Sequence, residues 1–575
     1  MAIVQISRIT ARKGLDIDLP QPLAGGELGW AIDARQLYIG NGELAEGAPV
    51  VGNTEILTEY SDLLAYTTAY TYQGAAGGYI VQTGATSGTP VSQSLQSRLD
   101  SFAVVTDFGA VGDGVTDDTA AINRALYQLY CREATSVENP QPRRSLFFPA
   151  GKYLISNTIK VPPFALLYGE GAQSSVLYFS APIWTSTVSY QSGVLVKNGA
   201  TYYRSLAEVP VGILISNASY WAAETLPAYI VRSADSLQQT GVNIATNGAT
   251  PPQNIVMNGF TLLTDQDDMS GLLIQNAVNS SFLNVDIQGP FTTADLNTVG
   301  NGNKAIEFAS TTSLVCSHIT IDNCKLSGFV YAINTPQQLK SITFSNNYLN
   351  TFYQGIYLGG TPVNGGATGF RIIGNMFDTI YANGIVIDAV SLNMSAYNMF
   401  FDVGNEFNGT TLPAFSVIDI DAENNVSVGD MFQRTDAYAG TFARININDS
   451  ASIAYDNASR ILQGTYVRET GLDTTLLNNQ GSAVAIDTVD ATEIRAFKLD
   501  YTIVRGTAVR TGTWTVVAST DGTGGTLVSS DTGQQNSSTG ITLSFTETGS
   551  VVTFKYTSTN TGVNAVLHYS ITHLA

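Results

Sequence analysis

The sequence predicts an all-β protein whose central part is a parallel β-helix, a solenoid of short strands wound into stacked coils. Strands of the pattern Ile-x-apolar recur through the middle of the chain at steps of 23 to 33 residues. Only 13% of the 575 residues are charged and 54 are glycine, a composition that favours short strands joined by tight turns. In the last hundred or so residues, apolar and polar positions alternate between turns, which predicts an antiparallel β-sandwich.

The central repeat is anchored by isoleucine, and each step has the size of one β-helix coil whose loops absorb differences in length. The six anchors are Ile306, Ile333, Ile356, Ile385, Ile418 and Ile445. A second strand in each coil ends at a turn with a recurrent residue, in the series Cys324, Asn347, Asn375, Asn405 and Asp430. This series predicts a ladder of side chains that stabilises the turns and is structural.

The stretch 105–123, VTDFGAVGDGVTDDTAAIN, marks the entrance to the solenoid. After a glycine-rich turn, Thr116 is expected to cap a helix that opens with Asp117 and Asp118. Together with LFFPAGKYLI further along, this pattern resembles the entry of pectate-lyase-like right-handed β-helices, as in polygalacturonases and many phage tailspikes. The resemblance implies a right-handed parallel β-helix over residues 102–465, with one helix covering its open end.

Residues 1–58 are predicted to form a separate small module, with strands at Leu28–Asp33 and Gln36–Ile39 around a turn. Its segment GELGWAIDARQLYIGNG resembles the virion-attachment segment of phage tail fibre and tailspike proteins. The resemblance implies docking on a phage tail or baseplate, or on another tail fibre. Residues 59–101 are expected to be a neck that contains a short helix within Ser92–Phe102.

Two further regions differ from the coil repeat. Residues 181–252 form an insertion rich in aromatic residues, among them Trp184, Tyr203 and Trp221. These rings could stack on sugar faces or pack the core of the insertion. Residues 466–575 form the predicted sandwich, which resembles a C-terminal domain of phage tail proteins, and the resemblance implies trimer formation or sugar contact.

The candidate catalytic residues are carboxylates on the outside of the coils. If the isoleucines of the repeat face inward, Asp388, Asp419 and Asp421 face outward on one sheet. Asp419 and Asp421 share a strand with Cα atoms ~6.7 Å apart, and carboxylates so close should raise at least one pKa. A protonated acid beside an ionised carboxylate is the pair that glycoside hydrolysis uses, and this spacing is nearer the inverting range. The alternatives are a solvated acidic surface and a Ca²⁺ site; Glu307, in the same outward column, is the next catalytic candidate.

The expected substrate-binding residues are Tyr357, Arg371 and Asn446 on the coils, with the three aromatic residues of the insertion. A second enzyme class, polysaccharide lyase, requires a base and a cation that neutralises a uronate, for which Lys340, Arg371 and Tyr357 are candidates. A third class is a spike that binds sugar without cutting it.

The charge and the rare residue types limit the partners. A formal net charge of −20 argues against nucleic acid and anionic membranes as partners. Three cysteines without regular spacing and only three histidines favour buried reduced thiols, and no metal or cofactor is expected. The sequence shows neither a membrane-spanning segment nor a signal peptide.

The order of the predicted regions and their resemblance to tailspike modules imply a homotrimeric phage tailspike, made in the host cytoplasm and carried on the virion tail. The expected function is to bind and depolymerise a bacterial surface polysaccharide, capsule or O-antigen.

Overall fold

The computed structural model divides the chain into two compact units, Met1–Ala103 and Val104–Ala575. It describes residues 12–42, 44–46, 50–59, 70–71, 83, 85–86, 89, 91–131, 143–240, 243–246, 250–292, 302–311, 314–335, 339–359, 368–388, 392–404, 416–422, 424–433, 445–447, 452–456, 460–463, 466–491, 494–519 and 527–574.

The first unit contains a small sheet in the order β1-β2-β3-β4. Strands β2 and β3 pair antiparallel, as the sequence predicts for this turn. The predicted neck helix is present but short, and the Ser94 hydroxyl caps it by accepting from Ser97 N at 3.0 Å. The elements are β1 (Arg12–Gly14), η1 (Asp16–Asp18), β2 (Leu28–Ala31), β3 (Gln36–Gly40), η2 (Leu44–Glu46), β4 (Asn53–Ile56), β5 (Tyr70–Thr71), β6 (Ser92–Gln93) and α2 (Leu95–Leu99).

The entrance motif begins the second unit but does not cap its helix as predicted. Strand β7 (Ala103–Val104) and the 3-10 turn η3 (Val105–Phe108) precede β8 (Asp113–Asp117), and α3 spans Thr119–Tyr130. Thr116 therefore lies in a strand, where its hydroxyl donates to Asp113 at 2.8 Å. The carboxylate of buried Asp118 instead accepts from the amides of Val111 and Gly112 at 2.7 and 3.0 Å. The acids of the motif thus stabilise its glycine-rich turn.

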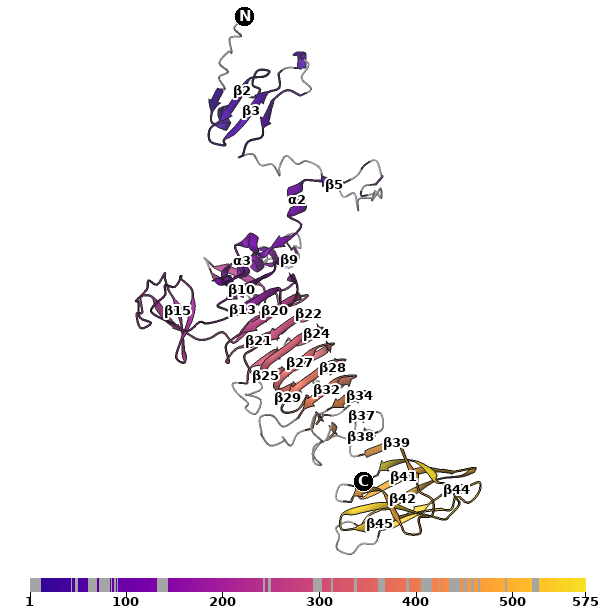
Figure 1. Cartoon of the computed structure of the whole chain (residues 1–575). Helices are drawn as coiled ribbons and strands as arrows, with labels where there is room; N and C mark the ends of the chain where they lie inside the picture. Colours follow the sequence, from indigo (N-terminus) through magenta and orange to yellow (C-terminus); the bar gives the residue numbers. More distant parts are fainter. Residues whose placement is uncertain are drawn as a thin grey trace, which may run out of the picture. The chain divides into compact units, whose positions relative to one another are not determined.

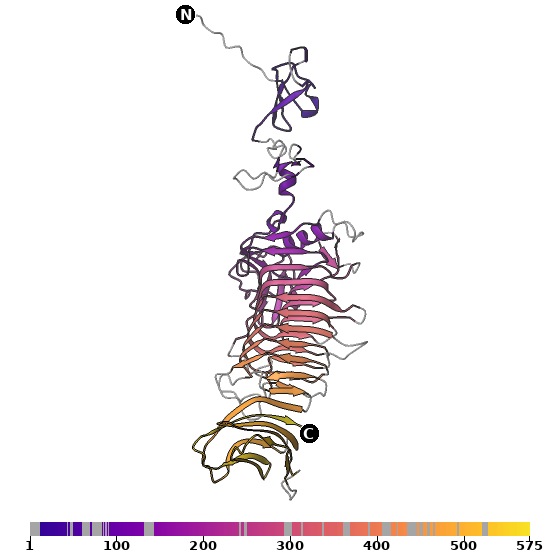
Figure 2. The ribbon, with the colours of Figure 1, turned by 90° about the vertical axis from the view of Figure 1, so that its right-hand side faces the viewer.

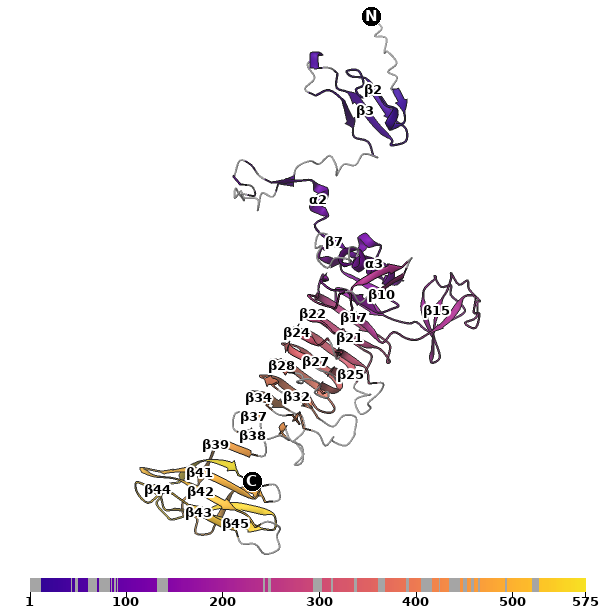
Figure 3. The same ribbon diagram turned by 180° about the vertical axis from the view of Figure 1, so that it is seen from behind.

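The middle of the chain is a parallel β-helix built from three ladders of strands. Figures 1 and 3 show the coils stacked in chain order from β10 to β37, and Figure 2 shows the stack after a quarter turn. Ladder A contains β11 (Ile159–Val161), β17 (Tyr229–Ser233), β21 (Ser270–Gln275), β23 (Lys304–Ala309), the second halves of β25 (Lys325–Thr335) and β27 (Tyr348–Leu358), β30 (Ile385–Ile387), β33 (Ile418–Ile420) and β36 (Ile445–Ile447).

The other two ladders complete each coil. Ladder B contains β9 (Leu146–Phe148), β12 (Leu166–Gly169), the first halves of β20 (Val256–Thr264) and β22 (Val278–Gln288), β24 (Cys316–Asp322), β26 (Leu339–Ser345), β28 (Thr368–Ile373), β31 (Met394–Ala396), β34 (Val426–Val428) and β37 (Ile453–Asp456). Ladder C contains β8, β10 (Gly151–Ile155), β13 (Ser175–Phe179), the second halves of β20 and β22, the first halves of β25 and β27, β29 (Met376–Ile380), β32 (Met399–Val403) and β35 (Met431–Gln433).

The predicted isoleucine register is confirmed along ladder A. Each of the six anchors pairs with the next one, and all six side chains are at most 4% exposed. The interior of ladder C is filled by stacked rings, with Phe400 placed 4.6 Å from Phe377 and 5.2 Å from Phe432 between ring centroids. Apolar columns of this kind supply the buried surface that holds a solenoid together.

A ladder of buried polar side chains runs along the turn between ladders B and C. The Oδ1 atoms of Asn347, Asn375, Asn398 and Asp430 each accept from the backbone N–H of the ladder residue before them, beginning at Cys324, always at 2.8 Å. The predicted ladder is confirmed except at one step: Asn398 occupies the position assigned to Asn405, which lies outside the described residues. All three cysteines are buried free thiols, as expected.

The insertion is smaller than predicted. A three-stranded antiparallel sheet of β14 (Leu195–Asn198), β15 (Thr201–Ser205) and β16 (Trp221–Glu224) has a core of its own. Strand β17 belongs to ladder A again, so the coil resumes before residue 252. A hairpin of β18 (Leu237–Thr240) and β19 (Asn243–Thr246) follows.

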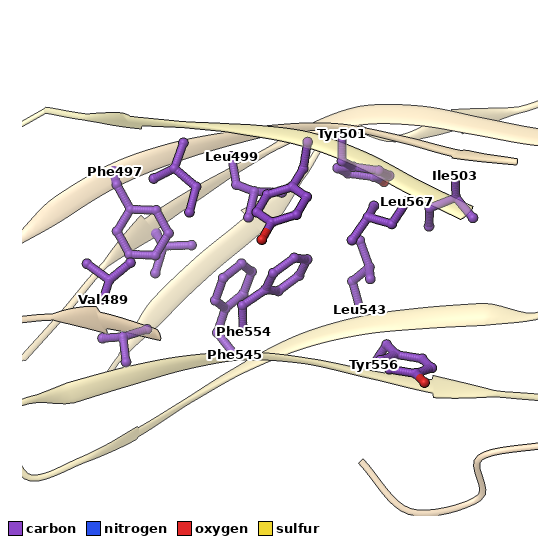
Figure 4. Close-up of a cluster of buried hydrophobic side chains, with 14 of the residues drawn as sticks. Val489, Phe497, Leu499, Tyr501, Ile503, Leu543, Phe545, Phe554, Tyr556 and Leu567 are labelled. Atoms are coloured by element: carbon purple, nitrogen blue, oxygen red, sulfur yellow. The ribbon is translucent and has the colours of Figure 1, made fainter. Parts of the chain in front are cut away.

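The C-terminal region consists of two antiparallel sheets that enclose a hydrophobic core (Figure 4). After β38 (Arg460–Gln463), the larger sheet contains β39 (Tyr466–Leu476), β47 (Ala565–His573), β41 (Ala496–Arg505), β42 (Ala508–Val517), β43 (Val528–Asp531) and β44 (Gln534–Gln535). The smaller sheet contains β40 (Val484–Asp490), β46 (Val551–Ser558) and β45 (Ile541–Thr548). Phe497, Phe545 and Phe554 from both sheets meet between them.

Candidate active site

The outward side of ladder A carries a column of residues in direct register, all of them polar except Val386. From one coil to the next, the paired residues are Glu307, Asn334, Tyr357, Val386, Asp419 and Asn446. Asp388 N donates to Leu358 O at 2.7 Å and Asp421 N donates to Ile387 O at 2.8 Å. These bonds place Asp388 and Asp421 at the same level on neighbouring coils. Three of the predicted carboxylates therefore lie on one small patch with Tyr357, which we call the acidic cluster (Tyr357, Asp388, Asp419 and Asp421).

Tyr357 is positioned by a hydrogen bond and by a glycine. Its hydroxyl donates to Asp388 Oδ2 at 2.9 Å. The ring lies over Gly359, where a Cβ atom would be 2.3 Å from the nearest ring carbon. Burial, the hydrogen bond to Asp388 and the charge of Asp388 raise the pKa of Tyr357. The phenol therefore stays protonated and acts as a hydrogen-bond donor to Asp388.

Asp419 is the carboxyl of the cluster whose environment favours the protonated form. Burial raises its pKa, and the charges of Asp421 and Asp388 raise it further, against hydrogen bonds that lower it. One of these bonds comes from Asn446 Nδ2 to Asp419 Oδ1 at 2.9 Å. Asp419 is half-buried whereas Asp421 is exposed. A desolvated carboxyl in β33 is thus followed by a solvated one directly after that strand, ~6.7 Å away at Cα in extended backbone.

The structure does not bring Glu307 to the acidic cluster. Four coil steps separate it from Asp419 in the register, which is roughly 19 Å at the usual strand spacing. Glu307 Oε2 accepts from Tyr229 Oη at 2.8 Å and lies 3.1 Å from Lys304 Nζ. These two contacts tie Glu307 into the scaffold.

Arg371 and Lys340 lie on a different face of the β-helix from Tyr357. Arg371 lies on β28 and Lys340 on β26, both in ladder B, whereas Tyr357 lies in ladder A. The two cations occupy neighbouring coils, as the sequence predicts, and they form no basic cluster with Tyr357.

Trp221 cannot offer a face to a sugar, because its side chain is only 3% exposed. Its ring packs edge-on against Tyr190, with ring centroids 5.2 Å apart. Trp184 and Tyr203 are half-buried and pack against the same core. The expectation of an aromatic sugar-binding surface is thus wrong for Trp221, and core packing is the main role of the group.

Sequence reasoning missed Gly359, which accommodates the ring of Tyr357, and Tyr331, whose phenol is one cause of the raised pKa of Tyr357. Gly359 is the last residue of the repeat segment GIYLG, so the signal was present in the sequence, but its contact with Tyr357 was not predicted. It also missed a concave surface of about 660 Å³ on the larger C-terminal sheet, which Asp473, Asp500 and His568 help to line. None of the predicted site residues lines this surface.

Comparisons with known proteins support the fold. Residues 102–357 match the model of the family described as rhamnogalacturonase A/epimerase, pectate lyase-like. The chain is similar to pectate-lyase-like proteins over a little less than half of its length. Together with the three ladders, this match confirms the pectate-lyase-like parallel β-helix predicted from the sequence.

Curated relatives match only short segments. A glucan 1,3-beta-glucosidase of Cochliobolus carbonum is 34% identical over 106 residues, 17% of this chain and 12% of that protein. A pre-neck appendage protein of Bacillus phage B103 is 33% identical over 92 residues, 16% of this chain and 9% of that protein. The chain thus spans about a tenth of the length of each.

Among solved structures, the tailspike protein of Acinetobacter baumannii phage AM24 aligns over 94% of this chain and 91% of that one. The identity is 12% and the TM-score 0.31.

The described residues hold no group of three or more His, Cys, Asp and Glu side chains arranged to bind a metal ion. Within the same residues, no helix is long and apolar enough to cross a membrane.

Proposed function

We propose that this protein is a phage tailspike that binds a bacterial surface polysaccharide, capsule or O-antigen, and cleaves it by glycosidic hydrolysis at the acidic cluster. The observation that carries the proposal is the pairing of Asp419, half-buried with a raised pKa, with exposed Asp421 two residues further along. A proton donor beside a hydrated carboxylate is the arrangement that glycoside hydrolysis requires.

In this mechanism Asp419 acts as the general acid and Asp421 as the general base. Protonated Asp419 gives its proton to the glycosidic oxygen as the bond to the anomeric carbon breaks. Asp421 removes a proton from a water molecule that attacks the anomeric carbon from the opposite side. The spacing of two residues in extended backbone, ~6.7 Å between Cα atoms, is the basis for expecting inversion at the anomeric carbon. Asp388, which accepts a hydrogen bond from Tyr357, stabilises the positive charge that develops on the sugar ring.

The same geometry disfavours β-elimination of a uronic acid. That reaction requires positive charge at the substrate carboxylate, and the cations considered for it, Lys340 and Arg371, lie on ladder B. Three aspartates at the cluster would repel a uronate. The raised pKa of Tyr357 also makes its phenolate harder to form as a base.

The assignment to a phage tail rests on the N-terminal module and on one relative. The segment GELGWAIDARQLYIGNG resembles virion-attachment segments of tail fibres and tailspikes, and the B103 relative is a phage appendage protein. Residues 1–58 would then dock on the tail, the baseplate or another fibre. Association of three chains is part of this proposal, because a solenoid alone leaves its outward faces open.

The proposal is tested by replacing the carboxylates one at a time in the full chain. Asp419→Asn and Asp421→Asn should each lower the release of reducing ends from a cleavable polysaccharide by at least about a hundredfold, and Asp388→Asn should also lower it. Asp378→Asn is the matched control, because Asp378 is a half-buried acceptor for Tyr348 on ladder C. Full activity in the three cluster variants would refute the site. Products that absorb in the ultraviolet as unsaturated sugars would favour the lyase, and binding without shortening would favour a non-catalytic spike.

A further inference from the structure

Two tyrosines lie side by side on successive coils, Tyr353 on the same strand as Tyr357 and Tyr381 on the next coil. Ala382 N donates to Tyr353 O at 2.7 Å, and Tyr381 N donates to Phe352 O at 3.1 Å. These bonds put Tyr353 and Tyr381 at the same level of neighbouring coils, at the corner between ladders C and A. Their ring centroids are 5.5 Å apart, with the ring planes tilted by 33°.

A third tyrosine lies one coil before Tyr353. Tyr331 pairs with Gln354 in the register, next to Tyr353 on β27. We call Tyr331, Tyr353 and Tyr381 the tyrosine strip. Tyr353 lies on the same strand as Tyr357 of the acidic cluster, four residues before it.

The core of the β-helix does not require these rings. At the same corner the interior is filled by Phe329, Phe352 and Ile380, each completely buried. The tyrosines of the strip are half-buried and lie on the outer side. Adjacent aromatic rings that remain partly open to solvent offer a flat apolar surface with polar tips, which suits the CH face and the hydroxyls of a pyranose.

We propose that the tyrosine strip is a saccharide-binding subsite that holds an uncharged stretch of polysaccharide on the same chain as the acidic cluster. This inference rests on the proposed function for the reaction, but the binding it describes can be measured without cleavage. Uncharged sugars are favoured because a saccharide that extends from the strip to the acidic cluster meets aspartates, which repel carboxylates. All the residues involved belong to one chain.

The experiment compares loss of the ring with loss of the hydroxyl alone. In the full chain carrying Asp419→Asn, which keeps the substrate intact, Tyr353→Leu and Tyr381→Leu should each weaken binding roughly tenfold. Tyr353→Phe and Tyr381→Phe keep the ring and should stay within about twofold of the parent. Tyr397→Leu is the control, because Tyr397 is 65% exposed and lies outside the strip. Binding is measured by titration calorimetry with purified neutral and uronate-containing bacterial polysaccharides.

The outcomes separate this inference from the proposed reaction. In chains that retain Asp419, the Leu variants should raise KM and leave kcat nearly unchanged. If the wild type cleaves polysaccharide and the Leu variants keep its affinity and KM, the tyrosine strip is not a binding subsite, and the proposed hydrolysis is unaffected. Weakened binding in the Leu variants of a protein that never cleaves would support the strip and overturn hydrolysis. Stronger binding of the uronate-containing polysaccharides would overturn the substrate class, and a wild-type chain that binds none of the probes would overturn both proposals.

Discussion

Two columns of Asp and Asn side chains follow the same coils and have opposite characters. In the turn ladder from Cys324 to Asp430, the side chains of the asparagines and of Asp430 are at most 2% exposed, and each Oδ1 accepts a backbone N–H. In the outward column that ends in Asp419 and Asn446, most side chains are partly open to solvent, and Asp388 and Asp421 lie close enough to raise the pKa of Asp419. Polar side chains that are fully hydrogen-bonded to one another stabilise the fold. Carboxylates held close to like charges are instead typical of a site that binds or transforms a ligand.

The largest expected effect on stability is in the turn ladder. Asn375 Oδ1 accepts from Asn347 N, and its Nδ2 donates to Phe344 O at 3.0 Å. Asn375→Ala would leave both buried groups without partners and should lower the free energy of unfolding by about 3 kcal/mol. Thermal unfolding followed by circular dichroism measures this change.

The control for the ladder variant is Asn350→Ala. Asn350 is half-buried on ladder C and donates to Asp378 Oδ2 at 3.2 Å, so its removal should cost less than about 1 kcal/mol. Equal losses in the two variants would contradict the distinction between the columns.

The next effect is a pH dependence that belongs only to the outward column. Because Asp419 must be protonated to act as the acid, activity should fall about tenfold per pH unit above its raised pKa. The charge of Asp388 is one cause of the raised pKa of Asp419. In Asp388→Asn the residual activity should therefore begin to fall at a lower pH than in the wild type. A pH–rate profile of each variant measures this fall on the alkaline side, which we call the alkaline limb.

The matched comparison is Asp378→Asn, which should leave the limb in place. A limb that stays fixed in Asp388→Asn, or moves to higher pH, would show that Asp388 does not influence the catalytic acid.

A smaller effect is expected from the glycine under Tyr357. In Gly359→Ala the new methyl group would overlap the ring, since the Cβ position is 2.3 Å from it. The ring must move, and the hydrogen bond to Asp388 is lost or lengthened, which should reduce activity about tenfold. Gly481→Ala serves as the control, because nothing lies within 4 Å of its Cβ position. Unchanged kinetics in Gly359→Ala would mean that the position of Tyr357 is unimportant for catalysis.

The parts that could be predicted from the sequence are those governed by strand periodicity. The isoleucine register and the adjacency of Asp388 and Asp421 both follow from alternation of side chains along stacked strands. The ladder step at Asn398 was misassigned to Asn405, because spacing alone does not identify which asparagine follows β31 (Met394–Ala396). The face of Arg371 could not be assigned from the sequence, because a coil has three faces and the repeat does not distinguish them. Tyr353 and Tyr381 were missed because they lie at a corner, where the alternation of a single strand no longer applies.

The smallest effect concerns Asp430, where the ladder ends in a carboxyl group. Burial raises the pKa of Asp430, against hydrogen bonds from Asn398, Ser427 and Ser395 that lower it. The folded state therefore binds this proton more tightly than the unfolded state, whose Asp pKa is about 3.9. Protonated Asp430 therefore stabilises the folded state at low pH. This stabilisation is lost as the pH rises through the raised pKa that Asp430 has in the folded state.

Asp430→Asn keeps the acceptor for Asn398 N and removes the charge. It should be more stable than the wild type by about 1 kcal/mol at pH 7, and the two melting temperatures should converge near pH 3. Asp430→Ala, which also removes the acceptor, should be less stable than the wild type at both pH values. If Asp430→Asn were destabilised most at pH 7, the ionised carboxylate would be the stable form, and the ladder would end in a charge that the protein stabilises.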